Sequence, residues 1–325
     1  MSKRFDSKKL FYIFAALLII LFITFLTKIP REKSTLKKAI VSFDTSAVER
    51  IRIKPRFQDG GEFGFFRENG EWKIKQGNIV SRPREGAVAN ILNDLITIKP
   101  SALVAVSEEK WKDYYVDDSL GIRIIAENRK GKKLADVVIG RFSYKPVNNP
   151  YGGYGGGSVD GTSYIRQYDD KAVYSVNGFL TFSFSGGFDD WRDKTLIHAA
   201  SNEITKISFT FPADSSYVLE KKDKTWYIGE TPADSAKTSD YLGDLIYANG
   251  EKFADGFKPD LQPLYKIVIE GNNLLSITVK CWKENDGSFI LNSSLNPDSY
   301  FESKADGVIS HILKPASHFR NAPRR

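Results

Sequence analysis

The sequence is poor in the residues that most often perform chemistry. Its 325 residues include one cysteine, Cys281, and three histidines, His198, His311 and His318. A lone cysteine excludes an intramolecular disulfide and a cysteine metal site, and the histidines lack the close spacing of a zinc motif. Neither a G-x-S-x-G elbow nor a G-x-x-x-x-G-K-[ST] phosphate loop is present. The sequence therefore predicts no catalytic residue, metal or cofactor and indicates a protein that is not an enzyme, although two carboxylates distant in the chain would escape such motifs.

The few reactive groups that do occur have structural explanations. Cys281 lies in SITVKCWK and His311 in GVISHIL, and both stretches alternate in the manner of strands. A lone cysteine in a strand is usually buried, and a histidine in such a stretch is usually structural. The acidic run around Arg192 (Asp189, Asp190 and Asp193) is interpreted as a solvated turn with an internal ion pair, in preference to paired catalytic carboxylates.

Basic charge is also scarce outside the first 38 residues. Those residues carry nine Lys or Arg and two acidic residues, which leaves 38 basic and 38 acidic residues in the remainder. Nucleic-acid binding needs a basic surface, which a neutral remainder does not provide, and this class of function is excluded. The cations beside the apolar segment described next suit anionic lipid headgroups.

One long apolar run is present. Residues 10–26 contain no charge, and thirteen of these seventeen are Leu, Ile or Phe. Extended to residue 29, the segment is about 30 Å long as a helix, which matches a bilayer core. It lacks the small-residue cleavage site of a signal peptide, so residues 10–29 are predicted to be an uncleaved anchor in contact with the bilayer. Lys and Arg flank both sides, and the short leader 1–9 favours a cytoplasmic N-terminus.

The sequence also contains an internal repeat, which indicates two copies of one structural unit. Five pairs of segments recur in the same order: VERIRI (48–53) with EITKISF (203–209), FFRENGEWKI (65–74) with VLEKKDKTWYI (218–228), NILNDLI (90–96) with DYLGDLI (240–246), GIRIIAEN (121–128) with YKIVIEGN (265–272), and SYIRQYDDKAVYSV (163–176) with SYFESKADGVISHI (299–312).

These patterns predict an α+β fold with two related repeats, each an antiparallel sheet with one packed amphipathic helix. Asn69 and Gly70 predict a hairpin turn, and Trp72 and Trp226 are expected in the sheet–helix cores. The helix within 84–98 is expected to bury Val88, Ile91, Leu92, Leu95 and Ile96. The expected organisation is a leader (1–9), an anchor (10–29), a linker (30–46), repeat domain 1 (47–187), a junction (188–202) and repeat domain 2 (203–325).

A family resemblance accompanies this pattern. The chain resembles the membrane-anchored bacterial family of unknown function number 4340, and the matching residues are Trp72, Ile74, Pro83, Ala87, Leu92 and Leu95, then YYVDDS (114–119) and WRDKTLI (191–197). Tyr115, Val116 and Ser119 replace the family's usual Gly, Leu and Pro. The resemblance implies extracytoplasmic placement and association with gliding-motility-type ABC transporter components. It implies no catalytic residue.

The expected function is therefore that of a non-catalytic, membrane-anchored accessory or scaffold subunit of a cell-envelope complex. The chain would cross the bacterial inner membrane once, with its bulk in the periplasm. Its expected partner is an envelope protein, for which an ABC permease is the candidate. The alternative is an envelope glycan-binding or glycan-processing protein. The glycine-rich stretch NNPYGGYGGGS (148–158) is interpreted as a surface insertion of about eight residues in repeat 1, and Tyr151 and Tyr154 are its candidate contact residues.

Overall fold

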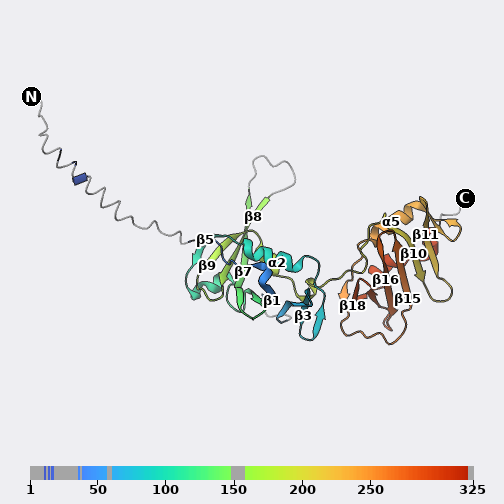
Figure 1. Ribbon diagram of the computed structural model, residues 1–325, viewed down its shortest axis with the longest axis horizontal. Helices are drawn as coiled ribbons and strands as arrows, with labels where there is room; N and C mark the ends of the chain where they lie inside the picture. The colour runs from blue at the N-terminus through green and yellow to red at the C-terminus, as the bar shows by residue number, and fades with distance from the viewer. Residues whose placement is uncertain are drawn as a thin grey trace, which may run out of the picture.

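The computed structural model describes Phe11, Phe14, Ala16, Leu17, Leu36 and residues 39–56, 61–147 and 158–320. Within these residues the chain forms two successive bodies, each a sheet with a helix packed on it (Figure 1). We call them repeat 1 and repeat 2.

Repeat 1 consists of η1 (Thr45–Ala47), β1 (Val48–Lys54), β2 (Phe63–Glu68), β3 (Glu71–Gln76), β4 (Ile79–Ser81), α2 (Ala87–Thr97), β5 (Pro100–Ala105), η3 (Glu108–Lys110), α3 (Trp111–Tyr114), β6 (Ile122–Asn128), β7 (Lys133–Val147), β8 (Ser158–Gln167), β9 (Val173–Asn177), α4 (Leu180–Phe184) and η4 (Phe188–Asp190). Repeat 2 consists of β10 (Ile204–Thr210), β11 (Tyr217–Lys222), β12 (Thr225–Ile228), β13 (Thr231–Pro232), α5 (Ser235–Leu245), β14 (Lys252–Phe253), β15 (Tyr265–Gly271), β16 (Leu274–Lys283), β17 (Phe289–Ser293), β18 (Asn296–Ser303), α6 (Val308–Ile312) and η5 (Ala316–Phe319).

The two sheets have the same topology. Their strand orders are β4-β3-β2-β1-β6-β7-β8-β9-β5 and β13-β12-β11-β10-β15-β16-β17-β18-β14, and neighbouring strands pair antiparallel. Matched strand by strand, the second order reproduces the first. This confirms the predicted α+β class with two repeats.

Turn chemistry and periodicity explain the local structure. Asn69 and Gly70 join β2 to β3 with φ of 52° and 88°, the left-handed values that a tight hairpin requires. The helix α2 buries Val88, Ile91, Leu92 and Leu95 against the sheet, as predicted. The expectation for Ile96 was wrong, because this side chain is 39% exposed beside the surface groove described below.

The two tryptophans are only partly buried. Trp72 and Trp226 pack against the edges of their respective cores and do not enter them. Each also lines a surface groove. The predicted core packing of the two tryptophans is therefore confirmed only in part.

Four of the five predicted segment pairs match the topology, and the fifth is wrong by one strand. Residues 163–167 belong to β8, whose counterpart in the sheet order is β17, whereas Ser299 lies in β18. The helices that follow β9 and β18 are α4 and α6, so these two correspond. The error arose because both segments begin with Ser-Tyr, although they occupy different strands.

The corrected matching also makes the surplus of repeat 1 larger than the predicted eight residues, because the two strands that flank 148–157 are themselves longer than their counterparts. The strand β7 has 15 residues against 10 in β16, and β8 has 10 against 5 in β17. The two strands pair as far as Val147 and Ser158, so the surplus includes a longer hairpin, which projects from the body in Figure 1. Residues 148–157, with Tyr151 and Tyr154, lie outside the described residues.

The predicted membrane anchor lies largely outside the described residues as well. Of residues 10–29 the structure describes Phe11, Phe14, Ala16 and Leu17, which are helical and exposed. Among the helices within the described residues, none has both the length and the apolar character needed to cross a bilayer.

The segment 191–197 connects the repeats by pairing with both. The backbone N–H groups of Arg84 and Asp193 donate to the carbonyls of Trp191 and Arg82 at 2.8 and 2.9 Å, on the repeat 1 side. Leu196 and Ile197 then donate to Ala248 O in repeat 2, both at 3.0 Å. Residues 191–197 are thus a short connecting segment, which we call the strap, whose backbone is hydrogen-bonded to both repeats.

Candidate functional site

The residues that the sequence singled out do not converge on a site. Cys281 is buried in β16, as predicted, and burial raises the pKa of its thiol to about 12. His198 packs on Tyr247, and His318 packs on Phe319. Partial burial and nearby lysines lower the pKa of His318. Within the described residues no group of three His, Cys, Asp or Glu side chains could hold a metal ion.

The strand interpretation of GVISHIL was wrong. His311 lies on the short helix α6, where its side chain is exposed and its Nδ1 is 4.0 Å from an Asp244 carboxylate oxygen. The corresponding pair in repeat 1 is Asp94 on α2 with Ser183 on α4, and burial raises the pKa of Asp94. Alternation over five residues does not distinguish a strand from one helical turn packed on a core.

The acidic run of the junction is organised around a buried arginine. Arg192 is 3% exposed, and its guanidinium donates to Asp189 at 3.0 Å, which confirms the predicted internal ion pair. It also donates to both carboxylate oxygens of Asp255 in repeat 2, at 2.8 and 2.5 Å, and stacks 3.5 Å over the Phe253 ring. The interpretation as a solvated turn was therefore wrong for Arg192, which ties the two repeats together.

The loop YYVDDS acquires its shape from a left-handed residue. Tyr115 has φ 57° and ψ 38°, the region in which glycine is favoured. Its neighbour Asp117 accepts hydrogen bonds from the backbone N–H groups of Ser119 and Leu120, both at 2.8 Å. The chain approaches Gly140 so closely that a Cβ there would lie 2.1 Å from Tyr114 O. The backbone thus explains why a glycine suits position 115.

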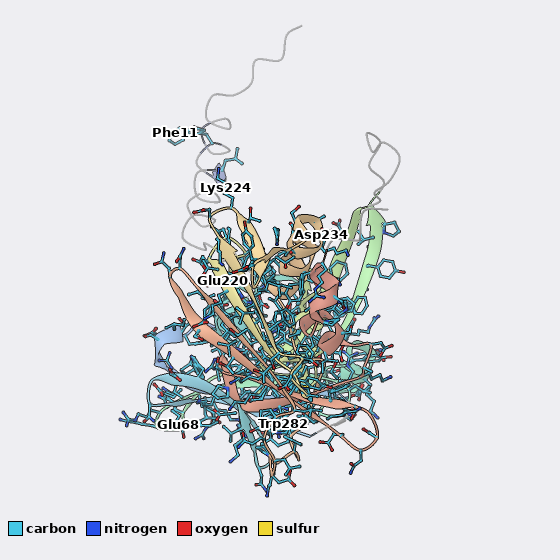
Figure 2. The ribbon with its side chains drawn as sticks, turned by 90° about the vertical axis from the view of Figure 1, so that its right-hand side faces the viewer. Phe11, Glu68, Glu220, Lys224, Asp234 and Trp282 are labelled. Atoms are coloured by element: carbon cyan, nitrogen blue, oxygen red, sulfur yellow. The ribbon has the colours of Figure 1, made fainter. Side chains whose placement is uncertain are left out.

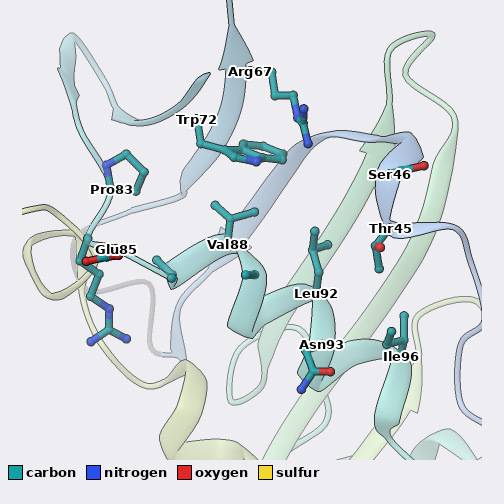
Figure 3. Close-up of a pocket in the computed structure, with 14 residues that line it drawn as sticks. Thr45, Ser46, Arg67, Trp72, Pro83, Glu85, Val88, Leu92, Asn93 and Ile96 are labelled. Carbon is teal, nitrogen blue, oxygen red and sulfur yellow. The ribbon is translucent and has the colours of Figure 1, made fainter. Parts of the chain in front are cut away.

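One hollow on repeat 1 lies between the β2–β3 hairpin and α2. This first groove has a volume of about 600 Å³. Figure 3 shows the Trp72 ring at its centre, between the Arg67 side chain and Val88 of α2. The Arg67 guanidinium lies 5.0 Å from the Trp72 ring centre. Leu92 and Asn93 of α2 form one wall, and Thr45 and Ser46 of η1 stand at the far end (Figure 3).

Repeat 2 has a second groove in the same place, with a volume of about 510 Å³. Arg67 is paired directly with Trp72 across β2 and β3, and Lys221 is paired in the same way with Trp226 across β11 and β12. Leu242 corresponds to Leu92 in the repeated helix sequence. The counterparts in the two grooves, matched by strand register and helix sequence, are Thr45 and Ser201, Ser46 and Asn202, Pro83 and Ala233, Glu85 and Ser235, Ala89 and Ser239, and Asn93 and Gly243.

The groove could offer a ligand a cation, the edge of an indole, hydroxyl groups and an apolar helix face. Such a set is suited to binding. The Ser46 hydroxyl of the first groove donates to Asp44 Oδ1 at 2.8 Å, and Asp44 also accepts from the Ser46 backbone N–H as the N-cap of η1. Sequence reasoning missed the groove because it interpreted both tryptophans as core residues. The cross-strand position of Arg67 and Lys221 opposite those tryptophans was the available signal.

Comparison with known proteins gives a family and no function. The profile of the family described as Domain of unknown function (DUF4340) matches residues 82–264. This match covers α2, the YYVDDS loop, the junction and the part of repeat 2 from β10 to β14. Neither a curated protein nor a solved structure gave a match.

Proposed function

The chain belongs to the DUF4340 family, and we propose that it is a non-catalytic accessory or scaffold subunit of a cell-envelope complex. In this proposal residues 10–29 anchor it in the bacterial inner membrane and the repeats lie in the periplasm. The partner is an integral envelope protein, with an ABC-transporter permease as the candidate.

The duplicated groove is the observation that carries the proposal. The cation and tryptophan occupy equivalent positions in both repeats, although Arg67 is exposed and the core does not require it. Two linked sites for one partner raise the strength of binding beyond that of either site. A chain with two such grooves suits a protein that holds another protein in place.

The junction supports the same function. Buried Arg192 binds Asp255 of repeat 2 with two hydrogen bonds, and the strap pairs with both bodies. Both features restrain the second groove relative to the first. Restraint of this kind lowers the entropy lost when both grooves bind one partner.

The glycan-binding alternative receives less support from the groove. A sugar ring stacks on an open aromatic face. In the first groove the faces of Trp72 lie against Arg67 and Val88, which leaves mainly the ring edge toward the hollow (Figure 3).

Site-specific photocrosslinking in native membranes tests the proposal. A photoreactive residue is placed at Asn93 in the first groove or at Gly243 in the second. Asn93 is exposed, and nothing lies within 4 Å of a Cβ added at Gly243. The matched control is Leu275 on β16, which is 86% exposed and lies outside both grooves. We expect one integral membrane protein to be captured from both grooves and not from Leu275. Recovery of the uncrosslinked chain at all three positions would contradict a partner-binding function.

A further inference from the structure

Repeat 1 carries an exposed cluster of aromatic side chains at the base of its long hairpin. We call this cluster the aromatic patch: Phe142 and Tyr144 on β7, Val159 on β8, and Phe179 and Phe182 at α4. The rings of Phe142 and Phe182 have centres 4.4 Å apart, and Phe179 lies 6.1 and 5.9 Å from them. Tyr144 is 62% exposed, Phe182 57% and Val159 48%.

The five side chains share one face of the hairpin. Phe142 and Tyr144 are two residues apart on one strand, so they point the same way. Gly161 is paired with Tyr144, and a Cβ there would lie 2.7 Å from the Phe179 ring, which places Phe179 on this face. Val159 is two residues from Gly161 on β8. An apolar surface of this kind marks an interaction site when it is contiguous.

The fold itself does not require the patch. In repeat 2 the ladder corresponding to β7 and β8 ends at the pair Lys283–Phe289, so Tyr144 and Val159 have no counterparts. Lys283 of β16 occupies the position in the strand register that Phe142 occupies in β7. At the start of α6, Gly307 and Ser310 occupy the positions that Phe179 and Phe182 occupy at the start of α4. Repeat 1 alone has both the longer hairpin and the aromatic side chains.

Chain length places repeat 1 near the predicted anchor. Leu36 packs against the core of repeat 1, and Ile40 is 1% exposed within it. Seven residue steps separate Leu36 from Ile29, the end of the apolar segment, and they span at most about 25 Å. The five additional residues of β7 extend the hairpin by about 17 Å relative to its counterpart. This reach is comparable to the length of the tether.

We infer that the aromatic patch of repeat 1 lies in the headgroup region of the membrane that anchors the chain. Exposed tyrosine and phenylalanine side chains suit the boundary between headgroups and acyl chains. The inference rests on the proposed anchoring of residues 10–29. With the patch in the bilayer surface and the tether short, repeat 1 is held against the membrane in one orientation.

An environment-sensitive NBD label on the full chain tests the inference. The label is attached at Val159→Cys, which retains all four aromatic side chains of the patch, and the control label at Ser310→Cys on α6 of repeat 2. The native Cys281 is 2% exposed and does not compete for the reagent. The chain is reconstituted into vesicles of phosphatidylethanolamine and phosphatidylglycerol in equal parts, and flotation is measured alongside emission.

We expect the chain to float with the vesicles, and the label at 159 to shift to the blue and gain intensity while the label at 310 does not. The double substitution Tyr144→Ser and Phe182→Ser, which gives position 182 the polar residue of repeat 2, should remove the gain without preventing flotation. Flotation with an unchanged label at 159 would overturn the inference and leave the anchor intact. Failure to float would overturn both.

Two further outcomes also count against the inference. An equal change at 159 and 310 would indicate general adsorption of the chain to lipid. Shielding of the label at 159 in native membranes but not in pure lipid vesicles would assign the patch to a protein partner.

Discussion

Removal of the Asp255 carboxylate is the most informative perturbation of the link between the repeats. The substitution Asp255→Asn removes the charge that faces Arg192, which is 3% exposed, and leaves only one of the two side-chain oxygens as an acceptor. Breaking a buried ion pair from one side costs about 3–5 kcal/mol. Asp189 still binds Arg192 at 3.0 Å and the Asp255 side chain is 33% exposed, so we expect about 2–3 kcal/mol. Urea titration followed by tryptophan fluorescence measures this loss of unfolding free energy.

The matched control is an exposed pair with a similar distance. Lys206 and Glu270 lie 3.0 Å apart with side chains 40% and 44% exposed, so Glu270→Gln should cost about 0–1 kcal/mol. Arg192→Met combined with Asp255→Asn should be more stable than Asp255→Asn alone, because it removes a buried charge that Asp189 compensates only in part. A cost for Asp255→Asn no greater than that of the control would refute the argument that Arg192 depends on its partner in repeat 2.

Three further substitutions test the local structure. Tyr115→Gly should stabilise the protein by about 1 kcal/mol in urea titration, because Tyr115 has φ 57°; a loss of stability would show that its side-chain contacts outweigh the backbone strain. Gly140→Ala should destabilise it by about 1–3 kcal/mol, because the new Cβ would lie 2.1 Å from Tyr114 O, and unchanged stability would mean that the loop can move. The Cys281 thiol has a pKa raised from 9.0 to about 12, so the stability it contributes is complete below pH 9 and is lost as the pH rises to 12, by at most about 4 kcal/mol. Cys281→Ala should lack this part of the alkaline decline in urea titrations between pH 8 and 11, and an unchanged slope would mean that the thiol is not responsible.

The sequence predicted those parts of the fold that depend on local patterns. Alternation and the Asn69–Gly70 turn identified the hairpins, and helical spacing identified the buried face of α2. Ile96 was misplaced because it lies at the margin of the apolar stripe, where periodicity alone does not separate core from surface. The fifth segment pair failed for a related reason: the register of a sheet is decided by pairing partners that are distant in the chain.

The candidate site depended on contacts that no local pattern contains. Arg192 looked like part of a solvated charged run, because its partner Asp255 lies 63 residues further along the chain. The Trp72 groove needs η1, the hairpin and α2 to come together, and tryptophan in a strand is more often structural. The aromatic patch likewise joins β7 with α4, whose helical turn the sequence did not reveal.

The structural differences between the two repeats suggest different functions for them. Both retain the groove, whereas only repeat 1 has the long hairpin and the aromatic patch, so we assign partner binding to both repeats and membrane contact to the first. Two grooves on one partner should act together. Arg67→Ala and Lys221→Ala each change an exposed or half-exposed cation and should alter stability by about 0.5 kcal/mol or less. In the photocrosslinking assay each single variant should weaken capture at its own groove and, through the lost avidity, also at the other, and the double variant should lose capture at both. If each substitution affected only its own groove, the two sites would be independent and a single bivalent partner would be ruled out.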